Sequence, residues 1–134
     1  MKYSIDRKKY LNELNTFIDN DIIKVIVGQR RVGKSYFTRQ IIDYIKAHNA
    51  KKHIVYINME QFEFSNIIKA SDLVDYVNEK STSVDNVLII DEVQEIREFE
   101  KAVRHFFNND FDVYITGSNS ELLSGELATM LSGR

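Results

Sequence analysis

The sequence has 134 residues, of which 43% are hydrophobic and 28% are charged, as in a single globular domain with a hydrophobic core. The net charge of −2 gives no general reason to expect DNA binding, and the absence of cysteine excludes disulfides and thiolate metal sites. No apolar run is as long as a membrane span, and the N-terminus lacks the apolar core of a signal peptide. We therefore expect a cytoplasmic protein with no membrane partner.

The first predicted element is a helix over residues 7–19, because apolar residues recur there at helical spacing. A β-branched run follows at Ile22–Val27 and predicts a buried strand. The segment 21–134 then forms the predicted core of the domain.

The stretch Gly28–Ser35 directly after this strand fits the pattern G-x-x-x-x-G-K-[ST], which is typical of a phosphate-binding loop. The glycines at its two ends let the backbone wrap closely around an anion, and the loop and the following helix direct N–H groups at it. Lys34 adds a positive charge for the terminal phosphates, and the Ser35 hydroxyl can ligate Mg²⁺. The predicted nucleotide-binding residues are Gly28, Gln29, Arg30, Arg31, Val32, Gly33, Lys34, Ser35 and Tyr36.

Helical and strand patterns alternate downstream of the loop, and the apolar strands show no polar face. Such a pattern predicts a parallel sheet with helices on both faces, with ligands bound at the carboxyl ends of the strands. The predicted elements are a helix over 37–48, a strand over 53–57, a short helix with Ser71 as its N-cap, a strand over 87–90, a helix over 96–107, a strand over 113–115 and a last helix over 122–131.

Asp91 and Glu92 directly follow the predicted strand Val87–Ile90. A carboxylate at the end of an apolar strand, downstream of a phosphate-binding loop, is predicted to support Mg²⁺. The second carboxylate can take a proton from a water that attacks the γ-phosphate, so Glu92 is the predicted general base. The alternative for Asp91 is a helix N-cap.

The strand over 113–115 runs into polar residues, and its carboxyl end is predicted to lie beside Asp91. Thr116 and Asn119 are therefore candidate catalytic residues that contact the γ-phosphate or orient the water. Ser118 and Glu121 have the spacing of a capping box and are assigned to the start of the last helix.

The loop, the pair Asp91-Glu92 and the segment Thr116–Ser120 together resemble AAA+ ATPases, and within them an uncharacterised prokaryotic family of predicted ATPases. The resemblance covers about 21–134. It implies a three-layer P-loop fold with strand order 5-1-4-3-2, in which the fifth strand and a lid lie outside this sequence, so that 1–134 is a fragment of a longer protein. It also implies ATP and Mg²⁺ as cofactors, while the role of Arg134 in the Gly-Arg segment is not assigned.

The predicted function is Mg²⁺-dependent ATP hydrolysis that drives a conformational change, with a homo-oligomer or a protein partner as its target. One alternative is a nucleotide-dependent switch that hydrolyses slowly or not at all. A DNA motor of the helicase type is a second alternative. Against it, only 57 positions separate Lys34 from Asp91, which is too few for the insertions that such motors usually carry. A guanine-specific enzyme is disfavoured because no Asn-Lys-x-Asp segment is present.

Overall fold

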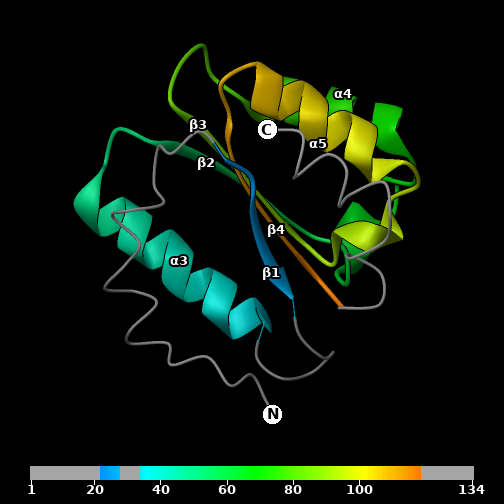
Figure 1. The fold of residues 1–134 in the computed structure, drawn as a ribbon, viewed down its shortest axis with the longest axis horizontal. Coiled ribbons are helices and arrows are strands. Elements are labelled where there is room, and N and C mark those ends of the chain that lie inside the picture. The colour runs from blue at the N-terminus through cyan, green and yellow to red at the C-terminus, as the bar shows by residue number, and fades with distance from the viewer. Residues whose placement is uncertain (1–21, 28–33, 119–134) are drawn as a thin grey trace.

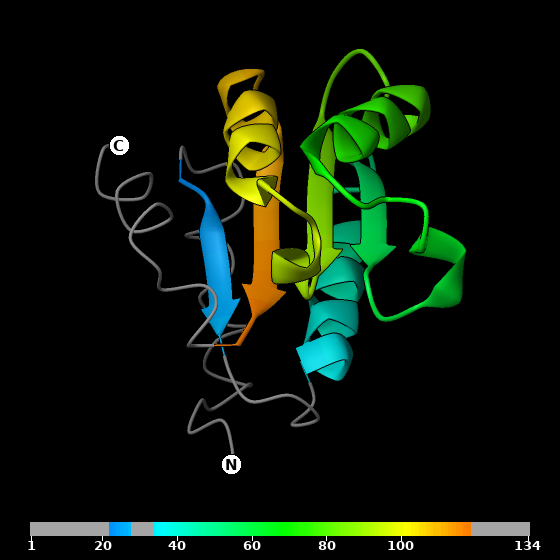
Figure 2. The same ribbon diagram turned by 90° about the vertical axis from the view of Figure 1, so that its right-hand side faces the viewer.

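The computed structural model describes residues 22–27 and 34–118. Four strands form one parallel sheet, with bounds β1 Lys24–Val27, β2 His53–Asn58, β3 Asn86–Asp91 and β4 Asp112–Gly117. They lie side by side in the order β1-β4-β3-β2 (Figure 2). This is the order 1-4-3-2 expected for these strands, so the predicted parallel α/β sheet is confirmed.

The helices form a layer on each face of the sheet. α3 (Lys34–His48) covers one face, and α4 (Ala70–Lys80) and α5 (Phe99–Asn108) cover the other (Figure 1). Two short 3₁₀ turns, η1 (Phe62–Phe64) and η2 (Val93–Glu95), follow β2 and β3. The three layers are those predicted from the alternation of strand and helix patterns.

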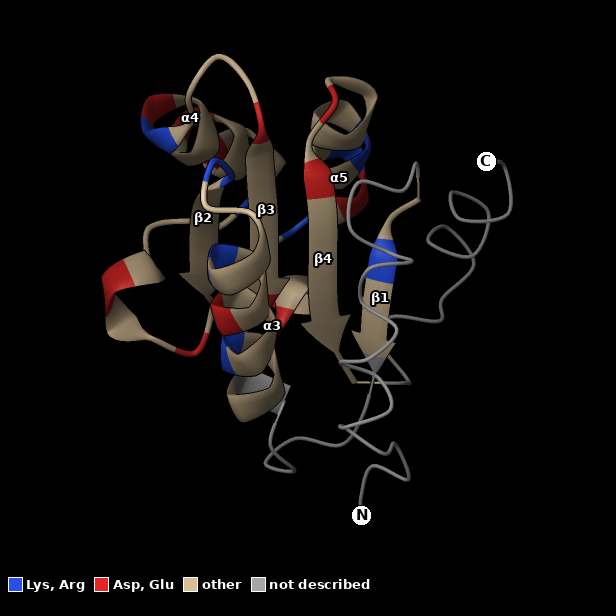
Figure 3. Ribbon diagram, turned by 90° about the vertical axis from the view of Figure 1, so that its left-hand side faces the viewer, with Lys and Arg blue, Asp and Glu red and all other residues tan. Residues whose placement is uncertain are grey.

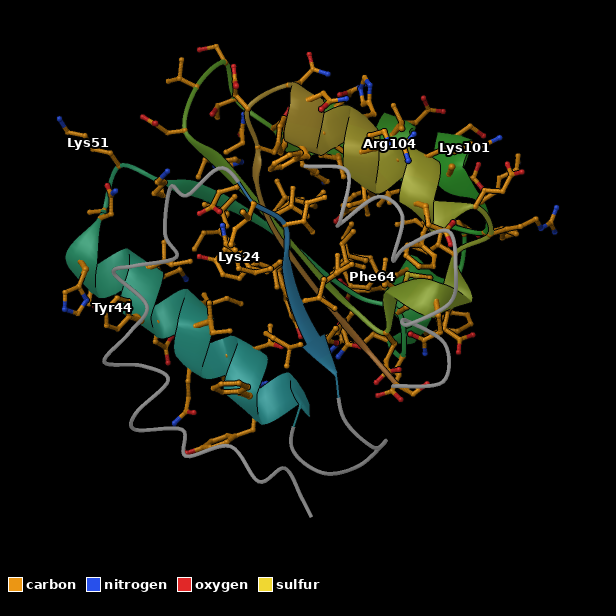
Figure 4. All side chains as sticks on the ribbon, viewed as in Figure 1. Lys24, Tyr44, Lys51, Phe64, Lys101 and Arg104 are labelled. Carbon is orange, nitrogen blue, oxygen red and sulfur yellow. The ribbon has the colours of Figure 1, made fainter. Side chains whose placement is uncertain are left out.

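Successive residues of β3 point to opposite faces of the sheet, and all six are buried. Val87 and Ile89 pack in the core beneath α3, whereas Leu88 and Ile90 pack in the core beneath α4 and α5. This explains why the strand is continuously apolar in sequence, since helices cover both of its faces. Figure 4 shows the two sides, with Lys24 lying toward α3 and Phe64 toward α4 and α5.

One buried ion pair lies at the amino ends of β1 and β4. Lys24 donates to the Asp112 carboxylate, and its ammonium also lies 4.8 Å from the centre of the Tyr114 ring. Figure 3 shows the basic band on β1 beside the acidic band that begins β4. A buried ion pair of this kind is tolerated because each charge has the other as its partner.

The start of α4 corrects the prediction that Ser71 is its N-cap. The N-cap is Lys69, and Ser71 lies inside the first turn. The Asp72 carboxylate accepts hydrogen bonds from the N–H groups of Ile68 and Lys69, at 3.0 and 3.1 Å. These backbone hydrogen bonds lower the pKa of Asp72. The capping residue of α4 is therefore Asp72. It lies inside the helix, and its carboxylate binds the N–H groups that precede the helix, so it is not the N-cap itself.

The start of α5 differs from its prediction as well. The apolar spacing predicts Ile96 inside the helix, but in the structure it follows η2, and α5 begins only at Phe99 after the left-handed residue Glu98. Ile96 is nevertheless buried in the same core. The apolar spacing was correct as a guide to burial and wrong as a guide to the helix start.

α5 ends in a Schellman motif. The N–H of Asp110 donates to the carbonyl of Phe107 at 3.2 Å, and the N–H of Phe111 donates to the carbonyl of Phe106 at 3.0 Å. Asp110 has the left-handed φ of 70° that this motif requires, and the Phe111 ring packs on Phe106 with the centroids 4.9 Å apart.

Three predicted segments lie outside the described residues: the helix over 7–19, the loop residues 28–33 and the chain from Asn119, including the last helix. Among the helices that the structure describes, none has the length and apolar character needed to cross a membrane.

Candidate functional site

The parallel register brings polar residues to one level at the carboxyl edge of the sheet. Asn58 of β2 is paired with Asp91 of β3, and Thr116 of β4 is paired with Ile26 of β1. Because Ile90 is paired with Ile115, the next residues, Asp91 and Thr116, also lie side by side. The edge at which β1 ends, at Val27, is therefore the edge that carries the candidate site.

Asp91 is the centre of a hydrogen-bond network in which three hydroxyls converge on one carboxylate. Its Oδ1 accepts from Thr38 Oγ1 at 2.8 Å and from Thr116 Oγ1 at 2.9 Å, and its Oδ2 accepts from the Tyr56 phenol at 2.6 Å. The carboxylate is only 1% exposed. Asp91 is thus a satisfied acceptor at the strand end, not the N-cap of a following helix, because η2 has Glu92 as its N-cap.

Strand alternation explains why these groups meet. Tyr56, Asp91 and Thr116 are each two residues beyond a residue that faces α3, respectively Ile54, Ile89 and Tyr114. All three side chains therefore lie on the α3 side of the sheet. Thr38 of α3 completes the network from the helix that packs on that face.

The Tyr56 phenol is held as a hydrogen-bond donor. Burial raises its pKa well above the ordinary value for tyrosine, and the neighbouring Asp91 carboxylate raises it further. The phenol therefore keeps its proton at neutral pH and donates it to Asp91.

Glu92 turns the chain away from β3. It has a left-handed backbone with φ of 56°, and its N–H donates to Thr116 Oγ1 at 3.1 Å. The residue is 4% exposed, and its Oε1 accepts from Gln94 Nε2 at 2.7 Å. A non-glycine residue in this conformation stores strain of about 1 kcal/mol, which is a feature often found at functional sites.

Gln94 is part of the same cluster. The Oε1 atom of its amide is buried and has no hydrogen-bond partner within the described structure. A buried acceptor without a partner costs about 1–3 kcal/mol, so this oxygen is a place where a bound water would be stabilised. Gln94 lies in η2, directly after Glu92 and Val93.

The structure thus brings together three of the predicted site residues, Asp91, Glu92 and Thr116. Lys34 is placed at the start of α3, on the helix that carries Thr38. Tyr36 is 55% exposed in the first turn of that helix. The predicted residues Gly28, Gln29, Arg30, Arg31, Val32, Gly33 and Asn119 lie outside the described part of the chain.

Sequence reasoning missed two members of the network, Thr38 and Tyr56. Thr38 lies four residues after Lys34, so helical periodicity places both on one face of α3, and this signal was available. Tyr56 carried no comparable signal, because its role depends on the register between β2 and β3. Glu60, another carboxylate near this edge, is exposed in the segment after β2.

The donor set at Asp91 suits Mg²⁺ bound together with phosphates. Within the described ranges, no three histidine, aspartate or glutamate side chains gather into a cage for a metal ion. Mg²⁺ usually binds through one or two carboxylates, substrate phosphates and waters, and a single buried carboxylate beside hydroxyls fits that pattern.

Comparisons with known proteins bear on the fold and on the family of the chain. Two curated relatives are similar to the chain. An uncharacterised protein of Haemophilus influenzae is 44% identical over 139 residues, which is 99% of this chain and 34% of that protein. An uncharacterised protein of Methanocaldococcus jannaschii is 41% identical over 114 residues, which is 84% of this chain and 24% of that protein. The chain thus spans about a third or less of these relatives.

A solved structure of a RuvB point mutant from Thermogota maritima has a similar fold, with a TM-score of 0.61 at 14% sequence identity. The match covers 95% of this chain and 44% of the RuvB chain. The family model of the AAA domain matches residues 20–134. A parallel sheet of this topology within that family indicates a nucleotide-binding ATPase domain, and the chain belongs to the AAA domain family.

Proposed function

We propose that this domain binds ATP with Mg²⁺ between the loop Gly28–Ser35 and Asp91, and hydrolyses it with Glu92 as general base. The observation that supports this most strongly is the Thr38–Asp91 hydrogen bond of 2.8 Å. It joins the helix that begins at Lys34 to the carboxyl end of β3, and this supports the proposal that the loop and Asp91 act on one nucleotide.

In this proposal the first half of the site holds the phosphates. The backbone N–H groups of the loop and of the first turn of α3 bind the anion, and the helix dipole adds to the attraction. Lys34 contributes the side-chain cation for the β- and γ-phosphates. Gly28 and Gly33 allow the close approach of backbone to ligand.

Ser35 and Asp91 are the residues that would hold Mg²⁺. When bound, the ion offsets negative charge on the phosphate oxygens. Asp91 can serve because its carboxylate is fixed by hydroxyl donors and, in the described part of the chain, no lysine or arginine forms an ion pair with it.

Glu92 is the residue that accepts the proton of the attacking water. Thr116 fixes the backbone of Glu92 and also binds Asp91, so one hydroxyl sets the relative position of the two acidic residues. Gln94 Oε1, which has no hydrogen-bond partner among the described residues, is a second acceptor for the same water. In this proposal Thr116 positions the two acidic residues, and its predicted contact with the γ-phosphate or the water stays a prediction.

One observation favours a slow switch as a second candidate function. The Gln94 amide donates to Glu92 Oε1 at 2.7 Å, and it occupies an acceptor site of the proposed base. Hydrolysis would then wait for this hydrogen bond to break. In either case the nucleotide acts on α3 and β3 together, and a second copy of the chain or a protein partner is the proposed receiver of that change.

The test is a titration of Mg-ATP into the wild-type protein and into Lys34→Ala, with steady-state ATPase assays of both. We expect the variant to lose tight binding, because Lys34 is the side-chain cation that the loop directs at the terminal phosphates. Lys46→Ala is the matched control, since Lys46 is an exposed lysine in the last turn of the same helix. Equal affinities for wild type and Lys34→Ala would overturn the proposal, and a wild type that binds but does not turn over would favour the switch.

A further inference from the structure

Three hydroxyls from three different elements meet at the Asp91 carboxylate. Thr38 comes from α3, Tyr56 from β2 and Thr116 from β4, and we call these three residues the hydroxyl cluster. A carboxylate can only accept hydrogen bonds, so each hydroxyl directs its single proton at Asp91. The orientation of the carboxylate is therefore fixed from three sides.

The hydrogen bonds leave a specific part of Asp91 available. A carboxylate has about four acceptor sites, two on each oxygen. From the part of the chain that the structure describes, Oδ1 receives Thr38 and Thr116, whereas Oδ2 receives only Tyr56. Counted over the described residues, one acceptor site remains, and it is on Oδ2, the atom that Tyr56 holds at 2.6 Å.

The donors are neutral, and this matters for the charge of the site. A lysine or arginine bound to Asp91 would compete with a metal ion for the negative charge. Within the described residues, the basic partners of carboxylates are Lys24, Lys69 and Lys101, and none of them pairs with Asp91. The hydroxyl cluster offsets the desolvation of a carboxylate that is 1% exposed while leaving its charge for a cation.

We propose that Thr38 and Tyr56 are positioning residues for the divalent cation, which with Thr116 hold Asp91 so that the free acceptor site of Oδ2 is presented to nucleotide-bound Mg²⁺ or to one of its waters. This inference rests on the proposed function, since it concerns the same nucleotide site. It predicts that removing either hydroxyl weakens the effect of Mg²⁺ on nucleotide binding while leaving binding without Mg²⁺ intact.

The experiment compares wild type with Tyr56→Phe and Thr38→Val, which remove a hydroxyl with little change in shape. The probe is a fluorescent ADP analogue, titrated once with Mg²⁺ and once with EDTA. The dissociation constant in EDTA divided by the dissociation constant with Mg²⁺ measures the coupling between metal and nucleotide. We expect this ratio to fall about 10-fold or more in each variant, as is usual when a residue that orients a metal ligand is removed, and the affinity in EDTA to stay at the wild-type value.

Three further variants separate positioning from general damage. Tyr114→Phe removes a buried phenol that lies 3.5 Å from Asp112, at the amino end of the same face of the sheet, and should leave the ratio unchanged. Thr38→Ser keeps the hydroxyl and should keep the coupling that Thr38→Val loses. Asp91→Asn gives the ratio expected when the metal ligand itself is lost.

The outcomes distinguish the two proposals. A wild type that binds the ADP analogue more tightly with Mg²⁺, together with unchanged ratios in Tyr56→Phe and Thr38→Val, overturns this inference and leaves the proposed function standing. A wild type without detectable nucleotide binding overturns the proposed function. An equal fall in Tyr114→Phe would show that any lost phenol lowers the ratio, and it would also overturn the inference.

Discussion

Asp91 and Glu92 are neighbours in the chain, yet their surroundings differ. Asp91 ends an extended strand and accepts three hydroxyl protons, whereas Glu92 has a left-handed backbone and a carboxylate bonded to the Gln94 amide. The hydrogen bonds hold Asp91 in one orientation, which suits a metal ligand. The hydrogen bond from the neutral Gln94 amide to Glu92 Oε1 is a contact that can exchange for one to a water, which suits a group that must accept a proton.

Glu92→Gln should retain ATP binding and lose hydrolysis. Glutamine has nearly the same shape but cannot take the proton of the attacking water, so kcat should fall by roughly 10²–10⁴. Steady-state ATPase assays and nucleotide titrations measure the two properties separately. Glu60→Gln is the control, because Glu60 is an exposed carboxylate near the same edge and its change should leave kcat unaltered. If Glu92→Gln retains the wild-type kcat, a residue other than Glu92 is the general base.

The Lys24–Asp112 ion pair leads to a prediction about stability. Lys24→Met should lower the free energy of unfolding by about 3–5 kcal/mol, because it leaves the Asp112 carboxylate buried without its cation. Adding Asp112→Leu should recover most of this loss, since an apolar pair needs no partner charge. Urea denaturation of the wild type and of the single and double variants measures both effects.

The exposed pair Lys69–Asp72, at 3.5 Å, provides the comparison for that series. Lys69→Met should change the free energy of unfolding by less than about 1 kcal/mol, as is usual for an ion pair in water. A loss in Lys24→Met as small as that in Lys69→Met would mean that other contacts of Asp112, such as the one with the Tyr114 phenol, or water offset the loss of the Lys24 charge.

At the scale of elements, a residue in the motif that ends α5 has a backbone conformation that is unfavourable for its amino-acid type. The C′ position of the Schellman motif requires a left-handed backbone, which is usually supplied by glycine, and this chain has Asp110 there with φ of 70°. The hydrogen bonds to Phe106 and Phe107 and the Phe106–Phe111 contact hold it in place. The packing of α5 therefore sustains a strained residue.

Asp110→Gly should raise the free energy of unfolding by about 0.5–1 kcal/mol, because glycine adopts this φ without a steric cost. The urea midpoint should rise with an unchanged slope. Asp43→Gly, an exposed position inside α3, is the matched control and should lower stability by about 1 kcal/mol. A lower midpoint for Asp110→Gly would show that the aspartate side chain contributes more than its backbone costs.

How far the elements could be predicted depends on the kind of signal. Strands β2 to β4 were located within one to two residues, because continuous apolar runs mark strands that are covered on both faces. The starts of α4 and α5 were placed wrongly at Ser71 and Ile96. Burial of Ile96 and the capping by Asp72 are real, but neither feature determines by itself where helical backbone begins.

The residues of the candidate site could be predicted where their role depends on their position within a single strand. Asp91, Glu92 and Thr116 could be proposed because each lies at the end of an apolar strand. Tyr56 could not be proposed, since its contact with Asp91 depends on the register that pairs His53 with Asn86. Neither segment contains a sequence signal for that register. The loop residues Gly28–Gly33 and Asn119 remain predictions.

At the scale of the whole molecule, nucleotide binding should stabilise the fold. A ligand that binds only the folded state at 100 times its Kd adds about 2.7 kcal/mol, which for a domain of this size raises Tm by about 5–10 °C. A thermal melt with and without Mg-ATP measures this. The Lys34→Ala variant should show little or no rise, and a full rise in that variant would contradict the assignment of Lys34.

The two faces of the sheet differ in the residues that they hold. The face beneath α3 holds the candidate site at its carboxyl edge and the Lys24–Asp112 pair at its amino edge, with Ile26, Ile89 and Tyr114 among the buried residues in that core. The face beneath α4 and α5 holds the larger apolar core. The site is thus built on one face, and the other face supplies much of the burial that keeps the sheet in place.

This division of the sheet restricts how the chain can change in length during evolution. A single residue inserted into β2 before Tyr56 would turn that side chain to the α4 and α5 face, and the same applies to Asp91 in β3 and Thr116 in β4. An insertion of two residues would restore the face but shift the side chain along the strand. Length changes should therefore collect in connections such as 81–85 between α4 and β3, where the exposed Val84 lies and no residue of the site is displaced.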